Sequence, residues 1–115
     1  MKSSFLIMIC SILLPLAAAV ASPSSAKDNY KTFCVQCHGM EGNGKGINVV
    51  DMSTQPRDHT DAKEMSSRTD KELTKVITEG GQSINKSVLM PPWKATLSDE
   101  EIKGLVNYLH QLCKC

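Results

Sequence analysis

The chain is poor in the residues that build a hydrophobic core. From residue 22 to residue 115, Leu, Ile, Val and Phe together make up 17 of 94 residues. That share lies below the level at which chains usually fold around a core of their own. The aromatic residues in this part are few: Tyr30, Phe33, Trp93 and Tyr108. A fold of this size therefore needs disulfides, a metal or a bound cofactor to complete its interior.

The first 21 residues have the pattern of a secretory signal peptide. Lys2 supplies the positive start, residues 5–16 are apolar, and residues 19–21 offer small side chains around a cleavage site. An uncleaved membrane anchor is the alternative, but residues 5–21 are short for a spanning helix and contain a serine and a proline. We expect cleavage, export to an oxidising compartment such as the bacterial periplasm, and one domain over residues 22–115 without a stable membrane anchor.

The exported part carries balanced charge. Its 12 lysines and arginines equal its 12 aspartates and glutamates, so the composition gives no reason to expect nucleic acid binding. Cys10 could suggest a lipoprotein, but the residue before it is the bulky Ile9, whereas lipid-attachment sites carry a small residue there. We therefore expect Cys10 to be removed with the leader.

Helix signals run along the rest of the chain, and no alternating strand pattern accompanies them. A short first helix is expected over residues 28–36. Thr69 and Glu72 have the spacing of a capping box, and so do Ser98 and Glu101. The second of these helices has the strongest apolar pattern, at positions i, i+3, i+4 and i+7: Ile102, Leu105, Val106 and Leu109. We expect an all-α fold with long irregular loops.

The motif Cys34-Val35-Gln36-Cys37-His38 indicates covalent attachment of one haem c. Two thiols one helical turn apart reach the two vinyl groups of the haem, and His38 then lies beneath the iron as its proximal ligand. A thioredoxin-like dithiol is an alternative, but its βαβ context is missing. A zinc site with Cys113 and Cys115 is another, and it would leave His38 without a role.

Several residues could bind the iron opposite His38. Met90 lies far enough along the chain to pass round the haem, and the two prolines after it hold its backbone extended. His59 is the second choice, and Met40 is too near His38 to reach the other face. The remaining candidates are expected to pack in the interior or lie on the surface: Met52, Met65 and His110.

A His/Met iron pair predicts a function. The thioether raises the reduction potential, and two protein ligands leave no open position for a substrate. We therefore expect a one-electron carrier between a redox donor protein and an acceptor protein, and no enzyme. The alternatives are a haem-based binder of small ligands, a peroxidase-like enzyme and, less favoured, an interaction module held together by zinc.

The exported sequence resembles the small bacterial class I c-type cytochromes over nearly its whole length. The resemblance rests on Tyr30, the Cys34–His38 motif with the glycine after it, Met90-Pro91-Pro92-Trp93, and residues 97–102 at the start of the last helix. It implies helices wrapped around one haem, with the first and last helices crossing, and it implies Met90 as the sixth ligand. Family members usually place a glycine eight residues before the first cysteine, where this chain has Ala26.

The resemblance also implies residues around the haem. A backbone carbonyl, often of a proline, orients the proximal imidazole, and Pro56 is the candidate. Trp93 either covers the haem and directs its indole N–H at a propionate or packs in the core, and Arg57 is either solvated or meets a propionate. Five lysines either form a docking ring for an acidic redox partner or belong to a mixed surface, which the equal number of acids favours: Lys27, Lys31, Lys45, Lys86 and Lys94.

Two further features remain. Residues 39–46 approach a phosphate-binding loop, but Gly46 stands where that loop needs Ser or Thr and no strand precedes it. We expect this segment to be backbone that passes the haem edge. The family does not explain Cys113 and Cys115, which could form a disulfide, link to a partner or remain free. An oxidising compartment favours the disulfide.

Overall fold

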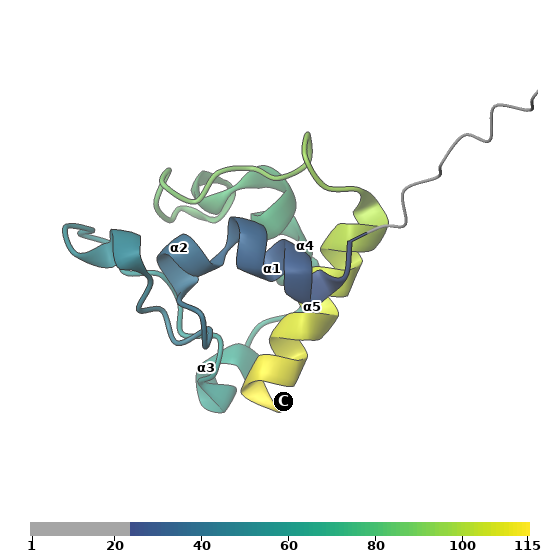
Figure 1. Ribbon diagram of the computed structural model, residues 1–115, viewed down its shortest axis with the longest axis horizontal. Helices are drawn as coiled ribbons and strands as arrows, with labels where there is room; N and C mark the ends of the chain where they lie inside the picture. The colour runs from purple at the N-terminus through teal and green to yellow at the C-terminus, as the bar shows by residue number, and fades with distance from the viewer. Residues whose placement is uncertain (1–23) are drawn as a thin grey trace, which may run out of the picture.

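The computed structural model describes residues 24–115 (Figure 1). The proposed leader, its cleavage site and Cys10 lie outside the described residues. Within that range there are only helices, turns and irregular loops, which confirms the all-α prediction. The elements in chain order are α1 (Ala26–Phe33), α2 (Val35–His38), the 3-10 helix η1 (Ile47–Val49), α3 (Ala62–Ser66), α4 (Asp70–Glu79), the 3-10 helix η2 (Gly81–Ile84) and α5 (Asp99–Cys113).

The two capped helices form as the sequence predicts. Both capping boxes are present: the side chains of Thr69 and Ser98 accept hydrogen bonds from the backbone N–H groups of Glu72 and Glu101. The carboxylate of each glutamate in turn accepts a hydrogen bond from the backbone N–H of its capping residue, at 2.8 and 2.9 Å. Two of the free N–H groups at each helix start are thereby satisfied.

The region expected to form one helix over residues 28–36 differs from the prediction. The helix begins earlier, because Ser25 accepts a hydrogen bond from the N–H of Asp28 and caps α1. It also divides at Cys34, which ends α1 and precedes α2. The short helix α3, capped by the side chain of Asp61, was not predicted.

The helices α1 and α5 cross, as Figure 1 shows. A Cβ placed on Gly104 of α5 would lie 3.5 Å from the Cβ of Ala26, which is ordinary van der Waals contact. The small residue that the crossing needs is thus supplied by α5, although α1 has alanine in place of the family glycine. The buried Asn29 donates from Nδ2 to Oε1 of Glu101 at 3.2 Å and ties the two helices together.

A small core lies along the inner side of α5. Four large side chains in it are fully buried, namely Tyr30, Met65, Ile102 and Leu105. The other buried apolar residues are Leu73, Ile77, Leu97, Val106, Leu109 and Cys113. Met65 is therefore a core residue, as its packing interpretation predicts. No helix within residues 24–115 is both long and apolar enough to cross a membrane.

Candidate functional site

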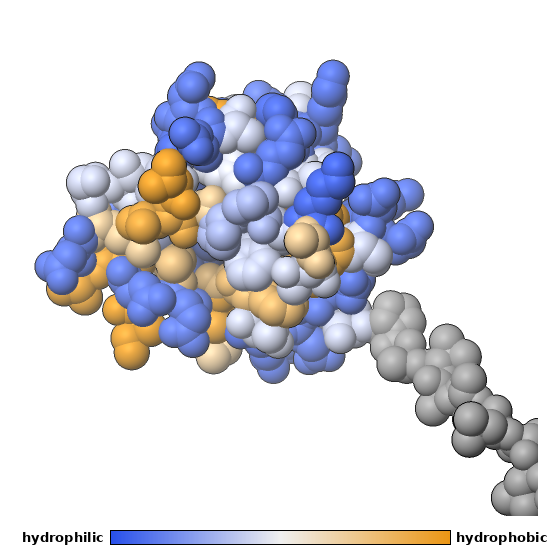
Figure 2. Space-filling view, turned by 90° about the horizontal axis from the view of Figure 1, so that it is seen from above, coloured by the Kyte–Doolittle hydropathy of each residue, from blue (hydrophilic) through white to orange (hydrophobic). Residues whose placement is uncertain are grey.

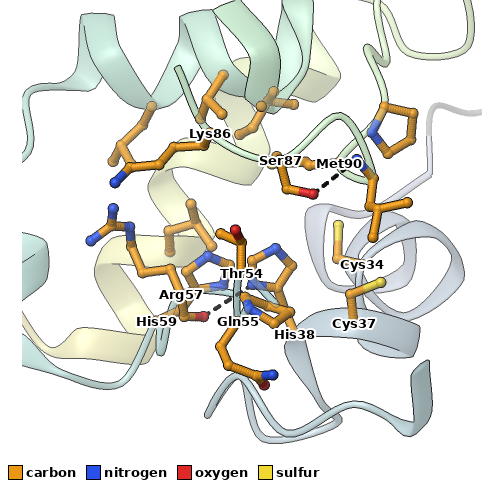
Figure 3. A pocket seen from close by; sticks show the side chains of 18 of the residues that line it. Cys34, Cys37, His38, Thr54, Gln55, Arg57, His59, Lys86, Ser87 and Met90 are labelled. Atoms are coloured by element: carbon orange, nitrogen blue, oxygen red, sulfur yellow. Dashed lines mark hydrogen bonds between the residues drawn. The ribbon is translucent and has the colours of Figure 1, made fainter. Parts of the chain in front are cut away.

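A cavity of about 510 Å³ lies between α2, the loop of residues 52–59, α4, the loop after η2, and α5 (Figure 3). This volume is within the roughly 300–1,000 Å³ of typical ligand sites. Apolar side chains from α1, α4 and α5 form much of its wall: Phe33, Leu73, Val76, Ile77, Leu105 and Leu109. The residues of the Cys-x-x-Cys-His motif and Met90 also line it.

Both motif cysteines present free thiols to this cavity. Cys34 lies at the junction of α1 and α2, and Cys37 follows one turn later on α2. Burial, with a smaller contribution from the neighbouring Cys37, raises the pKa of Cys34 to about 12. Its sulfur is therefore a protonated thiol at neutral pH, held on the same wall as His38.

The imidazole of His38 is held in one tautomer. Its Nδ1 lies 3.0 Å from the backbone carbonyl oxygen of Arg57, and because a carbonyl only accepts, Nδ1 carries the proton. Burial lowers the pKa of His38 below its ordinary value, so the ring is neutral at pH 7. The lone pair on Nε2 is thus free for a metal, which is how a hydrogen-bonded second nitrogen prepares a histidine ligand.

The carbonyl that orients His38 is not that of Pro56, and this part of the prediction was wrong. The carbonyl oxygen of Pro56 faces the glycine loop instead: a Cβ on Gly44 would lie 2.7 Å from it. That close approach turns Pro56 away from the imidazole and leaves Arg57, the next residue, to accept the hydrogen bond. Pro56 still lines the cavity.

His59 lies beside His38 and was not expected there. Their ring centroids are 4.1 Å apart and the planes are 18° from parallel. Burial, followed by the charges of His38 and Arg57, lowers the pKa of His59 well below its ordinary value. Nδ1 of the neutral ring forms a hydrogen bond with the hydroxyl of Tyr30, at 2.9 Å. Burial also raises the pKa of Tyr30, so the hydroxyl stays protonated at neutral pH.

The glycine-rich loop packs against α2 and does not line the cavity. The N–H of Gly46 donates to the carbonyl of Cys37 at 3.0 Å, and a Cβ on Gly46 would lie only 2.3 Å from the carbonyl oxygen of Gln36. Only glycine fits this contact. The loop therefore supports the motif from behind, and the expectation that it passes the haem edge was wrong.

Met90 is held by its backbone on the loop that follows η2. The N–H of Gly81 donates to its carbonyl at 2.9 Å, and its own N–H lies 3.4 Å from the carbonyl of Ser87. In Figure 3, Met90 and Ser87 lie on the opposite side of the cavity from His38 and His59. Met90 is half-buried and packs against the core.

The other candidate ligands are spread over the molecule. Met52 lines the cavity, Met40 is 64% exposed, and Met65 is 0% exposed in the core. His110 lies at the end of α5, where its Nε2 is 2.7 Å from Oδ1 of Asp70. Only Met52 and His59 therefore share the cavity with Met90.

Basic side chains gather at one edge of the cavity. Arg57 and Lys86 line it, and they also line a smaller adjoining hollow of about 180 Å³ together with Arg68. Arg57 forms an ion pair with Glu64, so its guanidinium group is not simply solvated. The Nε of Arg68 is buried and has no hydrogen-bond partner among the described residues. Buried donors are normally paired, so this edge is suited to a ligand carboxylate.

These features together fit a haem. The haem ring needs an apolar cavity, and its two vinyl groups need two thiols. The iron needs an imidazole nitrogen as a ligand, and the propionates need cations nearby. Each has a counterpart here, and Trp93 adds an aromatic wall by packing on Phe33 with ring centroids 5.0 Å apart. The Trp93 indole forms no hydrogen bond with any residue of the range 24–115.

Comparisons with known proteins agree with this site. The family described as "Cytochrome C oxidase, cbb3-type, subunit III" matches residues 21–109. Among solved structures, the KustC0563 c-type cytochrome is 26% identical with a TM-score of 0.61, covering 77% of this chain and 98% of that one. A point mutant of the same cytochrome gives 25% identity and a TM-score of 0.60, covering 77% of this chain and 99% of that one.

The reducing HAO-like protein complex Kustc0457/Kustc0458 of Kuenenia stuttgartiensis also contains a similar chain. That chain is 26% identical with a TM-score of 0.61, and the match covers 79% of this chain and 43% of the other. Among curated proteins, no sequence matches. The family match spans most of the sequence, and the chain therefore belongs to the cytochrome c family, in the subgroup typified by the cbb3-type subunit III domain.

Proposed function

We propose that this c-type cytochrome carries single electrons on one haem that is attached through Cys34 and Cys37 and ligated by His38 and Met90. The observation that carries the proposal is that all four side chains line one apolar cavity. The haem, when bound, supplies a one-electron iron couple. The described residues bind it, orient it and exclude water.

The hydrogen bonds around the two histidines support the ligand assignment. His38 has Nδ1 committed to the carbonyl of Arg57 and Nε2 available. His59 has Nδ1 hydrogen-bonded to the hydroxyl of Tyr30 and stacks on His38, so it lies on the same side of the cavity as His38. A residue that binds opposite His38 must come from the other wall, where the loop of Met90 lies.

Two protein ligands would favour electron transfer over catalysis. If His38 and Met90 both held the iron, a substrate or a small ligand would have to displace a protein group to reach the metal. The same two ligands in both oxidation states would also keep the reorganisation energy low. The function is therefore that of a carrier, which is the usual activity implied by the family.

Exposed apolar side chains provide a surface for redox partners. Figure 2 shows apolar side chains grouped toward one side of the face that it presents. Five large ones are strongly exposed: Met40, Ile47, Val50, Val88 and Leu89. Leu89 also lines the cavity, which supports docking of a donor and an acceptor protein close to the haem. The names of the relatives, an oxidase subunit and a reducing complex, agree with partners of this kind.

The attachment is tested on exported protein by denaturing electrophoresis with a haem stain. The stain should travel with the wild-type chain and be absent from the variant Cys34→Ala/Cys37→Ala. Sequencing the N-terminus of the exported protein should begin at Ser22 if the leader is cleaved as proposed. Stain that washes out of the wild-type chain on denaturation would contradict covalent attachment.

The assignment of Met90 as an iron ligand is tested with the variant Met90→Ala. Loss of the thioether should give a high-spin ferric spectrum, binding of carbon monoxide in the ferrous state, and a potential lowered by a substantial part of the roughly 0.8 V that axial ligands span. Met40→Ala is the matched control, because that methionine is exposed and outside the cavity. A low-spin spectrum in Met90→Ala together with a high-spin spectrum in His59→Ala would assign the iron to two histidines.

A further inference from the structure

The last turn of α5 brings together three side chains that can ligate a metal. A ring nitrogen of His110 and the sulfurs of Cys113 and Cys115 all lie within 4.8 Å of one another. His110 and Cys113 are three residues apart and so lie on one face of the helix. Within residues 24–115, this is the one such group of three or more His, Cys, Asp or Glu side chains. None of its members lines the haem cavity.

The backbone is shaped to bring the two cysteines together. Lys114 has φ 55° and ψ 38°, the left-handed conformation that residues other than glycine seldom adopt. Its N–H and that of Cys115 both donate to the carbonyl of His110. The reversal places the Cα atoms of Cys113 and Cys115 5.2 Å apart, and the two sulfurs form a disulfide. This bridge is the one that an oxidising compartment favours.

The two bridged sulfurs differ in their exposure to solvent. Cys113 is buried and Cys115 is exposed, and a reductant therefore reaches the sulfur of Cys115.

Asp70 prepares the histidine as a ligand. Its Oδ1 lies 2.7 Å from Nε2 of His110, across the contact between α4 and α5. A carboxylate that accepts a hydrogen bond from one ring nitrogen fixes the tautomer of the imidazole. Nδ1 of His110 is then the nitrogen left for a metal.

We propose that this turn is a redox-gated binding site for a thiophilic divalent cation such as Zn²⁺, with Cys113, Cys115 and His110 as ligands and Asp70 as the residue that positions His110. As a disulfide, Cys113 and Cys115 do not bind a metal. They become available as ligands when a dithiol reductant supplies the two electrons and two protons that convert the disulfide into two thiols. Two thiolates and one imidazole form a donor set that zinc prefers, with water in the fourth position.

The opening step balances as a thiol–disulfide exchange. A thiolate of the reductant attacks the sulfur of Cys115, and the sulfur of Cys113 leaves and takes up a proton. The second thiol of the reductant then releases Cys115 as a thiol, while the reductant closes to its own disulfide. Zinc binding afterwards displaces the protons of the two thiols.

Zinc uptake by the haem-loaded protein tests the site. The protein is reduced with a phosphine, desalted without oxygen, dialysed against Zn²⁺ and assayed by mass spectrometry of the metal. Reduced wild type should bind one equivalent more than oxidised wild type, and one equivalent more than reduced Cys113→Ser/Cys115→Ser. Absence of either difference overturns the proposal. Zinc held by Cys34 and Cys37, which would follow if haem attachment failed, is common to the two reduced proteins and cancels in that comparison.

Variants that keep the cysteines test the other two residues. Asp70→Asn should weaken zinc binding by about 10- to 100-fold, as loss of a ligand's hydrogen-bond partner does, and His110→Ala should weaken it by at least as much. Gln111→Ala, on the same turn, is the control and should bind as wild type does. Adding Cd²⁺ to the reduced protein should produce a sulfur-to-metal charge-transfer band in the ultraviolet difference spectrum. Wild-type affinity in His110→Ala, or no such band, contradicts the ligand set.

Discussion

His38 and His59 lie face to face with their ring centroids 4.1 Å apart, and each is fixed by a different hydrogen bond on its Nδ1 atom. His38 bonds to the carbonyl of Arg57, and His59 bonds to the hydroxyl of Tyr30, which is 1% exposed. The imidazole of His38 is thus packed against a second, neutral ring that is anchored on α1. The orientation of His38 depends on the packing of the first helix.

Removing the Tyr30 hydroxyl should destabilise this arrangement. Tyr30→Phe keeps the ring packing but leaves Nδ1 of the buried His59 without its hydrogen-bond partner, at an expected cost of about 1–3 kcal/mol in the free energy of unfolding. Urea unfolding of the haem-loaded protein measures it. Tyr108→Phe is the control, because Tyr108 contacts the ring of Tyr30 while its hydroxyl has no hydrogen-bond partner in the part of the chain that the structure describes. Equal losses in the two variants would contradict the assignment.

Met65→Ala should lower stability without changing the haem spectrum. The side chain is 0% exposed in the core and does not line the cavity, so truncation leaves a void that typically costs about 2–5 kcal/mol. Thermal unfolding and the ferric absorption spectrum are the two measurements. Met40→Ala, at an exposed position, should stay within about 0.5 kcal/mol of wild type. A spectrum changed by Met65→Ala would point to a role at the iron.

The two capping glutamates should make the protein sensitive to acid. Hydrogen bonds from Thr69 and from Ser98 lower the pKa of Glu72 and of Glu101, respectively, below the ordinary 4.5. The folded state therefore binds fewer protons than the unfolded state, and the stabilisation is complete above about pH 4.5 and is lost as the pH falls through the folded values.

Measuring the free energy of unfolding between pH 7 and pH 3 tests whether stability falls as the pH is lowered. Glu72→Gln/Glu101→Gln should show a flatter decline over the acid range than wild type. Glu100→Gln, one residue before Glu101 and outside the capping box, is the control and should follow the wild-type curve. Parallel curves for all three proteins would rule out the capping carboxylates as the cause.

The chain without haem should be largely unfolded. The core contains ten buried apolar residues, and the cavity wall of α4 and α5 would face water without the ring. Circular dichroism of Cys34→Ala/Cys37→Ala that has been freed of haem should show low helicity and no cooperative melt. Strong helicity with a sharp transition would show that the core suffices by itself.

The features that were predicted correctly depend on residues that are close together in the sequence. The capping boxes of α4 and α5 each lie within four residues, and the Cys-x-x-Cys-His motif lies within five, so no tertiary information was needed to find them. The division of the first helix at Cys34 and the short helix α3 were missed, because marginal helices depend on tertiary packing.

The missed site features depend on contacts between distant segments. Nothing in the loop sequence separates the carbonyl of Pro56 from that of Arg57; the close approach of Pro56 to Gly44 decides which one faces His38. The stacking of His59 on His38 spans 21 residues, and the contact of Ala26 with Gly104 joins two ends of the domain. Nothing in the sequence around Tyr30 or His59 indicates that these two side chains would contact each other.

The crossing of α1 and α5 has a consequence for the order of assembly. Leu105 and Leu109 form part of the wall of the cavity, yet they follow the two thiols of the attachment motif by 68 to 75 residues (from Cys37 to Leu105 and from Cys34 to Leu109). During synthesis the proposed attachment motif emerges long before that wall exists. A truncated chain that ends before Asp99 would keep every proposed attachment and ligand residue while leaving one side of the ring open to water. Coupling the cofactor to the polypeptide and sealing it from solvent are therefore separable events in the maturation of this cytochrome.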